Sequence, residues 1–528
     1  MVDQVRQAPA AAQAVMVAVI VVAVFTVWLG RLDIMDPDEG RHSEIAREML
    51  ASGNYLTPRI HGEPYYDKPA PFYWMLAGSF TVLGQNARAA RLPSATAALV
   101  TIAATAAMAG LAYGPTAAPL AALLLATTLG FVAVGRHTIV DMPFTAALTV
   151  AVLCLLRSVL AGSSPYPFYV SVGLATVIKG PAALVLLGAL ALVGLFLPHE
   201  RQALPARLKN MRPVSGAAIV AALVVPWYLA AWLADPNYIE TFLIHHNLAR
   251  YTAGVSSTHD QPWYYYAVAL PLFALPWSPL MAVAGVSRLG KQARTRADLL
   301  LAAWALLVIA FFAPARTKLV TYMMPALPAL ACMAAAWLST ERSGDGRTPG
   351  LLGAAGTAWT VFVAVLATGA TGWLILAAGL SPWFAAVALL AVSVAVGTWR
   401  WQHARTYGRV VVGVAAATLC LLAVVYGGAS SYINQERSLE PAGRLLAELG
   451  PETRAYAYRC PGHSLAFYAG RPVPSTDQAG EALARLQASG PVVLFTKQKH
   501  LGELDLGAAA GVTQLWHGGR SRVMVGRR

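Results

Sequence analysis

Residues 11–30 read AAQAVMVAVIVVAVFTVWLG and contain no charged side chain. A helix of about 20 residues rises about 30 Å, which matches the hydrocarbon core of a lipid bilayer. The flanking Arg31-Leu32-Asp33 lacks the small residues of a cleavage site. We therefore expect this segment to stay as a membrane anchor and not to be removed as a signal peptide.

Similar charge-free stretches recur along the chain. The longest, residues 350–399, is long enough for two helices divided by the turn signal at residues 379–382. Hydrophobic residues make up 57% of the chain and charged residues 12%, about half the charged share of a soluble protein. A polytopic α-helical membrane protein is therefore predicted. We predict thirteen spans, at 11–30, 92–112, 115–135, 142–156, 165–178, 181–198, 213–234, 262–287, 299–315, 319–338, two within 350–399, and 410–428.

The positive charge of the chain follows its membrane topology. The formal net charge is +14, and basic clusters fall at 199–212, 288–296, 340–347 and 400–409. With the N-terminus in the cytoplasm, all four clusters lie in cytoplasmic loops, as the positive-inside rule requires. No folded segment carries the basic face that a nucleic-acid partner would need, so we predict none.

Three longer polar regions fall on the opposite, outer side, at 31–91, 235–261 and 429–528. In the last of these, 454–459 and 492–497 have the pattern of strands and 479–489 has helical spacing. The sequence therefore predicts a transmembrane domain at 1–428, with the outer loop 31–91, and a small outer α/β domain at 429–528.

The first outer loop opens with acidic residues, in the stretch DPDEGRHSEIAREML at 36–50. Asp36, Asp38 and Glu39 repel one another, so they normally need a cation, a donor or a substrate nearby. Apolar residues between 39 and 50 have helical spacing and predict a short helix along the membrane surface. The alternative is that Asp38 and Glu39 only cap this helix.

Other charged residues lie at the ends of predicted spans on the same outer side. Lys68 stands beside Asp67 and a Pro-rich bend in YYDKPAP at 65–71, although a Lys near aromatic residues can also be a simple interfacial anchor. Cations at a membrane surface suit a lipid phosphate, and carboxylates beside them suit catalysis at a hydroxyl or sugar centre. The further members of this set are Asp141, Lys179, Arg250, Arg316 and Lys318.

Two features raise the question of a metal ion. Adjacent histidines such as His245 and His246 rarely reach one ion together, and we interpret them as interface residues. Asp36 and Asp38 form an Asp-x-Asp pair, which in other transferases holds a divalent cation. Because cationic side chains can replace such a metal, no metal ligand is predicted, and a divalent cation is left open as a cofactor.

The ordered set of these motifs resembles the polyprenyl-phosphate-dependent glycosyltransferases of the GT-C superfamily. Within them it is most similar to the aminoarabinose transferases that modify lipid A. His42 stands where those transferases usually have Tyr, and Asp67 replaces their Glu. These departures concern the sugar and the acceptor more than the reaction class. The matching segments are 38–41, 44–49, 66–69, 140–142, 179–180, 250–251 and 318–322.

The resemblance implies an enzyme that moves a sugar, such as 4-amino-4-deoxy-L-arabinose, from undecaprenyl phosphate to lipid A or another envelope acceptor, with inversion. It implies a bacterial inner-membrane protein with a periplasmic active site. Asp38 would be the principal catalytic carboxylate and Asp141 the second. The carrier phosphate would be held by Lys68, Arg250, Lys179 and Arg41, and the site would be lined by Tyr65, Asp67, Lys318 and Tyr322.

Three alternatives remain at the level of sequence. The enzyme could resemble a protein O-mannosyltransferase or act on another envelope glycan. A transporter of lipid-linked sugars is less favoured, because we find no internal repeat and the notable charges do not lie at the bilayer midplane. A non-catalytic envelope scaffold would make Asp38 and Asp141 dispensable.

Overall fold

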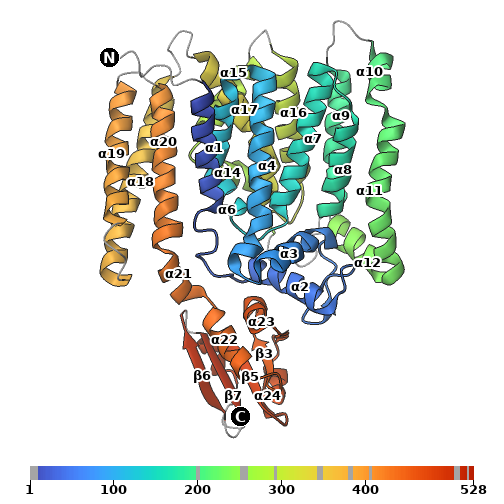
Figure 1. Ribbon diagram of the computed structural model, residues 1–528, viewed down its shortest axis with the longest axis vertical. Coiled ribbons are helices and arrows are strands. Elements are labelled where there is room, and N and C mark those ends of the chain that lie inside the picture. Colours follow the sequence, from blue (N-terminus) through green and yellow to red (C-terminus); the bar gives the residue numbers. More distant parts are fainter. Residues whose placement is uncertain are drawn as a thin grey trace.

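The computed structural model describes residues 10–197, 203–249, 260–290, 294–341, 349–378, 384–403, 407–504, 512–519 and 522–527. Most of its helices stand side by side in a bundle, with the N-terminus at one end and the C-terminal region beyond the other (Figure 1). The bundle contains α1 (Ala10–Thr26), α4 (Ala87–Tyr113), α5 (Ala117–Ala126), α6 (Leu129–Gly135), α7 (Asp141–Ala161), α8 (Tyr166–Lys179), α9 (Ala182–Phe196), α10 (Leu204–Met211), α11 (Pro213–Ala234), α14 (Tyr265–Phe273), α15 (Ser278–Gly290), α16 (Arg296–Phe312), η3 (Val320–Ala326), α17 (Leu327–Glu341), α18 (Pro349–Ala378), α19 (Phe384–His403), α20 (Tyr407–Leu422) and η4 (Ala423–Gly428).

The chain is a multi-pass membrane protein. Among the described residues, five helical segments are long and apolar enough to cross a membrane alone, and two bent pairs, α5 with α6 and α14 with α15, bring the number to seven. Every predicted stretch coincides with helical segments, two of which continue into another type of helix (η3 with α17 and α20 with η4). The helix bounds are therefore consistent with the predicted thirteen spans, although the exact number stays a prediction. The predicted turn at 379–382 lies outside the described residues, between the end of α18 and the start of α19.

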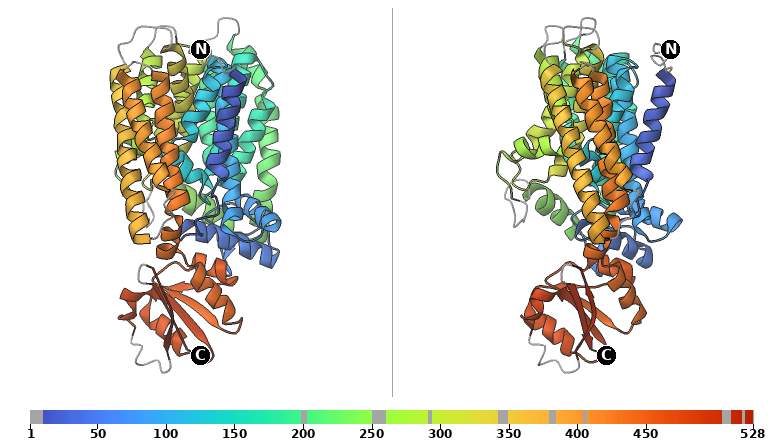
Figure 2. Two further views of the ribbon diagram at one scale, coloured as in Figure 1. Left: turned by 60° about the vertical axis from the view of Figure 1, so that its left-hand side comes forward. Right: turned by 90° about the vertical axis from the view of Figure 1, so that its left-hand side faces the viewer.

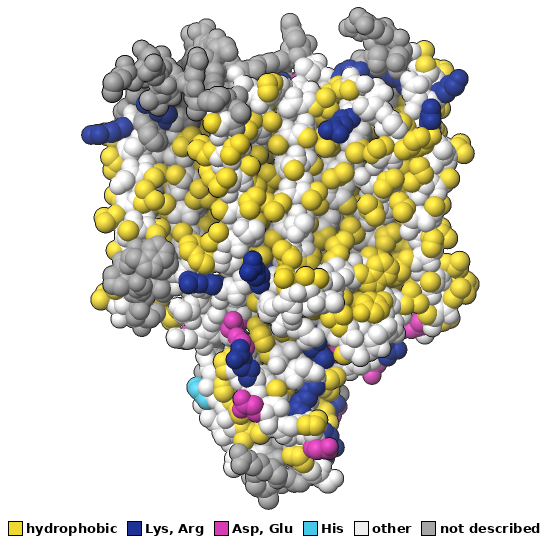
Figure 3. Space-filling view, viewed as in Figure 1, with side chains coloured by type: hydrophobic (Ala, Val, Ile, Leu, Met, Phe, Trp, Pro, Cys, Tyr) yellow, Lys and Arg dark blue, Asp and Glu magenta, His cyan; other side chains and the backbone are white. Residues whose placement is uncertain are grey.

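Packing distinguishes the outside of the bundle from its inside. Apolar side chains are spread over the face of the bundle that Figure 3 shows, and Val214 of α11 is 85% exposed, as expected for a residue against lipid. Small residues bring the inner helices close together. A Cβ atom on Gly135 would lie 2.6 Å from Cε1 of Phe25, so the approach of α6 to α1 requires glycine. Five alanines of α17 are fully buried, namely Ala329, Ala331, Ala334, Ala335 and Ala336.

The first predicted outer region is more ordered than a polar loop. The helix predicted between residues 39 and 50 is observed as α2 (Asp38–Ser52), which ends at Gly53 in the left-handed conformation. Most of its residues are buried in the protein. A short hairpin follows, with β1 (Arg59–Ile60) and β2 (Glu63–Pro64), and then the apolar helix α3 (Ala70–Leu83). Both helices lie across the end of the bundle nearest the C-terminal region, beside α12 (Asn237–Ile239), which leads into the π-helix η2 (Glu240–Ala249) (Figure 1).

The C-terminal region forms a separate α/β layer structure below that end (Figures 1 and 2). Its mixed sheet has the order β4-β3-β5-β7-β6, with parallel pairing around β3 and antiparallel pairing around β7. The predicted strands are observed as β3 (Arg454–Tyr458) and β5 (Val492–Lys497), and the predicted helix as α24 (Ala479–Gln487). The other elements are α21 (Ser430–Arg437), α22 (Glu440–Glu448), α23 (His463–Ala469), β4 (Ser475–Thr476), α25 (Gln498–Leu501), β6 (Thr513–Gly518) and β7 (Arg522–Arg527).

Alternation along the strands divides the core of this region into two. Val493 and Phe495 of β5 pack with α22 and α23 on one face, whereas Val492 and Leu494 pack with α24 on the other. This is the period of two expected for a sheet buried on both faces. Helix α23, on the first of these faces, also packs against α2.

Candidate active site

Asp38 is the first residue of α2. Its Oδ1 lies 3.3 Å from Nη1 of Arg41, one turn further along the helix, and its side chain is 48% exposed. Pro37 places the start of the helix here, because proline has no N–H to continue a helix backwards. The carboxylate is thus oriented by one cation and is still accessible to a substrate.

Lys68 and Asp67 form the second group of the site. Lys68 Nζ lies 3.1 Å from Oδ2 of Asp67, and both side chains are largely buried. The same Oδ2 accepts a hydrogen bond from the Tyr65 hydroxyl at 3.1 Å. Arg41 donates a hydrogen bond to Tyr65 and interacts electrostatically with Asp67. Because Arg41 also pairs with Asp38, it connects Lys68 and Asp67 to Asp38.

Asp141 and Lys179 form the third group. Asp141 begins α7 and Lys179 ends α8, positions at which the helix dipoles favour an acid and a base respectively. Their side chains form an ion pair. The Lys179 ammonium also lies 4.7 Å from the centre of the Tyr322 ring, which is a cation–π contact. Lys179 interacts electrostatically with Lys68 and Asp67 as well, so the three groups form one electrostatic network.

The remaining predicted residues are placed differently. Lys318 is 4% exposed and donates to the backbone carbonyls of Gln261 and Ala315, the first at 3.0 Å. It therefore connects the chain that follows α16 to the outer region at 260–261. Arg250 lies outside the described residues.

The sequence indicates that Glu39 either needs a cation or donor nearby or caps α2, but it does not identify the partners. In the structure Glu39 has a dense set of them. The carboxylate is 1% exposed and accepts from Arg91 Nε at 2.8 Å and Nη2 at 2.7 Å. It also accepts from the backbone N–H of Thr138 at 3.0 Å and lies 3.2 Å from Nδ1 of His137. Glu39 therefore joins α2 to α4 and to the segment before α7, and it does more than cap α2.

His42, the departure from the family pattern, is a buried neutral residue. Its Nδ1 lies 3.1 Å from the Tyr73 hydroxyl, and its ring packs edge-on against Phe72 at 5.2 Å. Burial, with the positive charges of Arg41 and Lys68 nearby, lowers the pKa of His42 to about 3. Its role is to pack α2 against α3.

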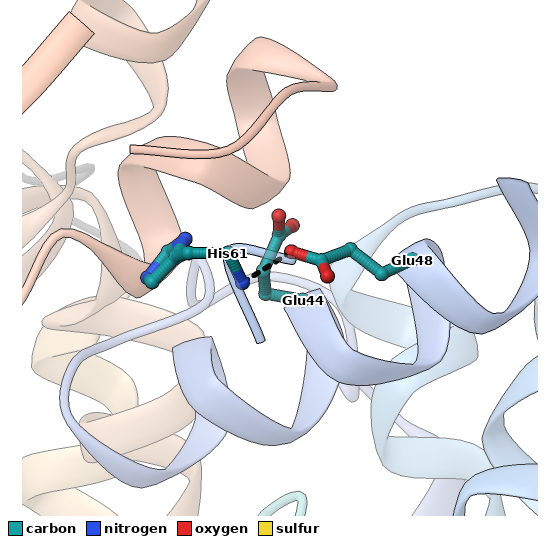
Figure 4. Close-up of side chains that lie close together, drawn as sticks. All are labelled: Glu44, Glu48 and His61. Atoms are coloured by element: carbon teal, nitrogen blue, oxygen red, sulfur yellow. Dashed lines mark hydrogen bonds between the residues drawn. The ribbon is translucent and has the colours of Figure 1, made fainter. Parts of the chain in front are cut away.

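Glu44, Glu48 and His61 offer ligand atoms within 4.8 Å of one another, the spacing of a metal site (Figure 4). Each of these groups already has protein partners. Glu44 accepts two hydrogen bonds from Arg47, both at 2.7 Å. The two oxygens of Glu48 accept from the backbone N–H groups of His61 and Gly62. The cluster therefore fits the role of holding the hairpin β1–β2 onto α2 better than that of a metal centre.

His61 in turn contacts the C-terminal region. Its Nδ1 accepts from the backbone N–H of Val473 at 3.3 Å, so its Nε2 carries the proton and donates to Nδ1 of His463 at 3.0 Å. The two rings stack with centroids 5.2 Å apart. Burial lowers the pKa of both imidazoles, that of His463 to about 3.

The contact between these histidines is expected to weaken in acid. The folded protein keeps both rings neutral, whereas the unfolded chain takes up protons below about pH 6.5. The stability of the contact is therefore full above about pH 6.5 and falls as the pH drops toward 3. The stability of this contact is measured by hydrogen exchange of the backbone amides of α23, corrected for the pH dependence of the intrinsic exchange rate. His500→Asn, in the same region, should keep this dependence, and pH-independent protection of α23 between about pH 5 and 7.5 would contradict it.

Comparison with known proteins gives both a family match and a fold match. Residues 67–232, from the Lys68 segment to α11, match the family described as dolichyl-phosphate-mannose-protein mannosyltransferase. The undecaprenyl phosphate-alpha-4-amino-4-deoxy-L-arabinose arabinosyl transferase of Pseudomonas aeruginosa strain PAO1 is 30% identical over 306 residues, which are 56% of this chain and 54% of that protein. The chain thus spans about half the length of the curated relatives that it matches.

Two solved structures resemble nearly the whole chain. The crystal structure of ArnT from Cupriavidus metallidurans bound to undecaprenyl phosphate has a TM-score of 0.76 at 21% identity, and 97% of each chain is covered. The apo state of the same protein has a TM-score of 0.78 at 20% identity, with the same coverage. The predicted fold class, a multi-pass helical membrane protein with a small α/β region at its C-terminal end, is confirmed, because nearly the whole chain shares the fold of these structures.

Proposed function

We propose that this protein is an inverting membrane glycosyltransferase that moves a sugar, aminoarabinose or a related one, from undecaprenyl phosphate to lipid A or a similar envelope acceptor. One observation supports this most strongly. The carboxylates Asp38, Asp67 and Asp141 and the cations Arg41, Lys68 and Lys179 meet in one network at one end of a bundle with the fold of such transferases. The name of the matched relatives contains both the sugar and the carrier lipid, and it therefore supports the assignment of these two substrates.

The network suits transfer from a lipid phosphate. In the proposed reaction an oxygen of the acceptor forms a bond to the anomeric carbon, and the bond from that carbon to the phosphate oxygen breaks. The electron pair leaves with the phosphate, whose charge grows in the transition state. Fixed cations such as Lys68 stabilise that charge without reorganising. In the structure the cations are paired with carboxylates, so an arriving phosphate competes with Asp67 for Lys68.

Asp38 is proposed to orient the acceptor, and to remove its proton if the acceptor is a hydroxyl. A phosphate of lipid A is already nucleophilic and needs no strong base. Asp141 is proposed as the second acid, held by Lys179. Arg250 is proposed to share the carrier phosphate with Lys68, and Tyr65, Tyr322 and Lys318 to shape the site.

The proposal also assigns the sides of the membrane. Described basic residues such as Arg207, Lys209, Arg212 and Arg288 belong to elements at the end of the bundle opposite α2 (Figure 1). The positive-inside rule favours the cytoplasm for that end. The end with α2, and the C-terminal region at 429–528 as a domain separate from residues 1–428, would then face the periplasm of a bacterial inner membrane.

The function is tested with the purified full-length protein, a polyprenyl-phosphate aminoarabinose donor and lipid A. Mass spectrometry of the lipid products names both the sugar and the acceptor. Modified lipid A is the expected product, and free polyprenyl phosphate should appear in equal amount. The alternative of a protein mannosyltransferase, which the match of residues 67–232 favours, is tested with a polyprenyl-phosphate mannose donor and a protein acceptor. Transfer of mannose to the protein, with no transfer of aminoarabinose to lipid A, would replace this proposal.

Lys68→Ala is expected to weaken binding of undecaprenyl phosphate about 10-fold to 100-fold, because a charge-assisted contact to a phosphate contributes about 1.5–3 kcal/mol. Binding is measured with the lipid in detergent, at low and at high salt. Lys497→Ala, in β5 of the C-terminal region, is the matched control and should bind as the wild type does. Wild-type affinity in Lys68→Ala would remove this residue from the phosphate site.

A further inference from the structure

The segment before α2 is held by a residue more than four hundred positions away. Oδ1 of Asp36 accepts from the backbone N–H of Ser464 at 2.9 Å, and Oδ2 accepts from the Ser464 hydroxyl at 2.9 Å. Ser464 belongs to the first turn of α23, where backbone N–H groups have no partner within the helix. Asp36 therefore supplies the acceptor for that turn from outside the C-terminal region.

The approach of the two segments is close. A Cβ atom on Gly40 would lie 2.6 Å from the Ser464 nitrogen and still closer to Oδ1 of Asp36, so only glycine allows this contact. Further contacts surround it. The backbone N–H of Ile34 donates to the Tyr468 hydroxyl at 2.7 Å, and Arg47 donates to the carbonyl of Gly470 at 2.9 Å.

Asp38 itself has few restraints. Its side chain is 48% exposed and its ion pair is with Arg41, which belongs to the same helix. The position of its backbone is instead determined by its neighbours on both sides. Glu39 is fixed to Arg91 of α4, and Asp36 is fixed to Ser464 with only the rigid Pro37 in between.

We propose that Asp36 is a positioning residue for Asp38, and that α23 of the C-terminal region completes the active site by holding Asp36 through Ser464. This inference rests on the proposed function, because it assigns Asp38 to catalysis. It also gives Asp36 a role other than that of a metal ligand in the Asp36-x-Asp38 pair, since both of its oxygens accept from Ser464.

An amide can replace the Asp36 carboxylate in this role. Burial raises the pKa of Asp36 to about 7, against the opposing effect of its bonds to Ser464, so the neutral form is readily reached. An Asn at this position keeps an oxygen that accepts from the Ser464 N–H, whereas an Ala loses both acceptors. This difference separates a positioning role from one that needs the negative charge.

The test compares Asp36→Ala, Asp36→Asn and Ser464→Ala in the full-length protein, with Glu503→Gln as the control. Glu503 bonds to Tyr458, Arg459 and His500 of the same C-terminal region. Transfer is measured with the polyprenyl-phosphate donor and lipid A. We expect kcat to fall about 100-fold in Asp36→Ala, because a displacement of about 1 Å has such an effect, with the KM for the donor within about twofold. Ser464→Ala should be intermediate, and Asp36→Asn should stay within about threefold of the wild type.

Hydrogen exchange at residues 34–41 adds a readout that does not depend on activity. Faster exchange in Asp36→Ala, and wild-type exchange in Glu503→Gln, are expected. A wild-type kcat or unchanged exchange in Asp36→Ala would overturn the inference, and so would an Asp36→Asn variant as inactive as Asp36→Ala. If the wild type transfers no sugar from the donor, the proposed function fails, and this inference fails with it as a statement about catalysis, while exchange still reports whether Asp36 orders α2.

Discussion

Asp38→Asn is expected to lower kcat for sugar transfer by about 10²-fold, the effect of a misplaced acceptor, and by up to about 10⁴-fold if the acceptor is a hydroxyl that also needs a base. The amide keeps the size of the side chain, but it cannot take a proton and holds an acceptor group less well. Because Asp38 is 48% exposed and pairs with Arg41 at 3.3 Å, its replacement should leave folding and the KM for the donor nearly unchanged. Steady-state kinetics with mass-spectrometric detection of the lipid product measures both constants.

Glu63→Gln is the matched control for this variant. Glu63 is an exposed carboxylate of the same outer region, in β2, and its amide variant should transfer sugar at the wild-type rate. A kcat within twofold of the wild type in Asp38→Asn would remove Asp38 from the chemistry. In that event Asp141 becomes the leading carboxylate, and Asp141→Asn is the next variant to measure.

The second large effect is expected for Glu39→Ala, as a loss of stability of about 3–5 kcal/mol. Such a loss is typical when one partner of a buried ion pair is removed and the other charge stays buried. Arg91 is 4% exposed beside Glu39 and would have no carboxylate partner in the variant. Thermal unfolding of the purified protein in detergent measures the change.

The control for this prediction is an exposed pair in the C-terminal region. Arg444 and Glu440 are 72% and 27% exposed, and pairs of this kind contribute about 0–1 kcal/mol. Glu440→Gln should therefore unfold close to the wild-type temperature. Equal unfolding temperatures for Glu39→Ala and Glu440→Gln would show that the buried pair does not anchor α2.

The ion pair of Glu39 and Arg91 also determines how stability depends on pH in acid. Burial alone would raise the pKa of Glu39, but the charges of Arg91 and His137 outweigh it and lower the pKa to about 2. The stabilisation is therefore complete above the pKa of a free glutamate, about 4.3. It is lost only as the pH falls from there through about 2.

Much of the secondary structure could be predicted from local sequence patterns, namely apolar stretches and the periodicity of helices and strands. The apolar stretches place the helices of the bundle, and the boundaries of β5 and the start of β3 follow from strand patterns of five or six residues. Helix α2 could be predicted because Pro37 marks its start and its apolar residues repeat with helical spacing. Helix α3 was missed inside the predicted polar region 31–91, since its fourteen residues are too short for a span.

The pairings within the site could be predicted only in part. The sequence predicts that charged residues at the outer ends of spans lie close together. The pair of Asp141 and Lys179 agrees with this, because Asp141 begins α7 and Lys179 ends α8. Glu39 with Arg91 and Asp36 with Ser464 are separated by 52 and 428 residues. No local pattern specifies such partners, because they depend on how α4 and α23 pack in three dimensions.

The separation of Asp36 from Ser464 also has a consequence for how the protein is made. Residues 31–69 leave the ribosome with the first helices, whereas Ser464 is synthesised only after the whole bundle. Domains fold as units in the order of their synthesis, so the first turn of α2 gains its last anchor near the end of translation. An unfinished chain already in the membrane would then carry Asp38 in an incompletely ordered segment. If the proposed function holds, such a chain would not yet consume the lipid donor.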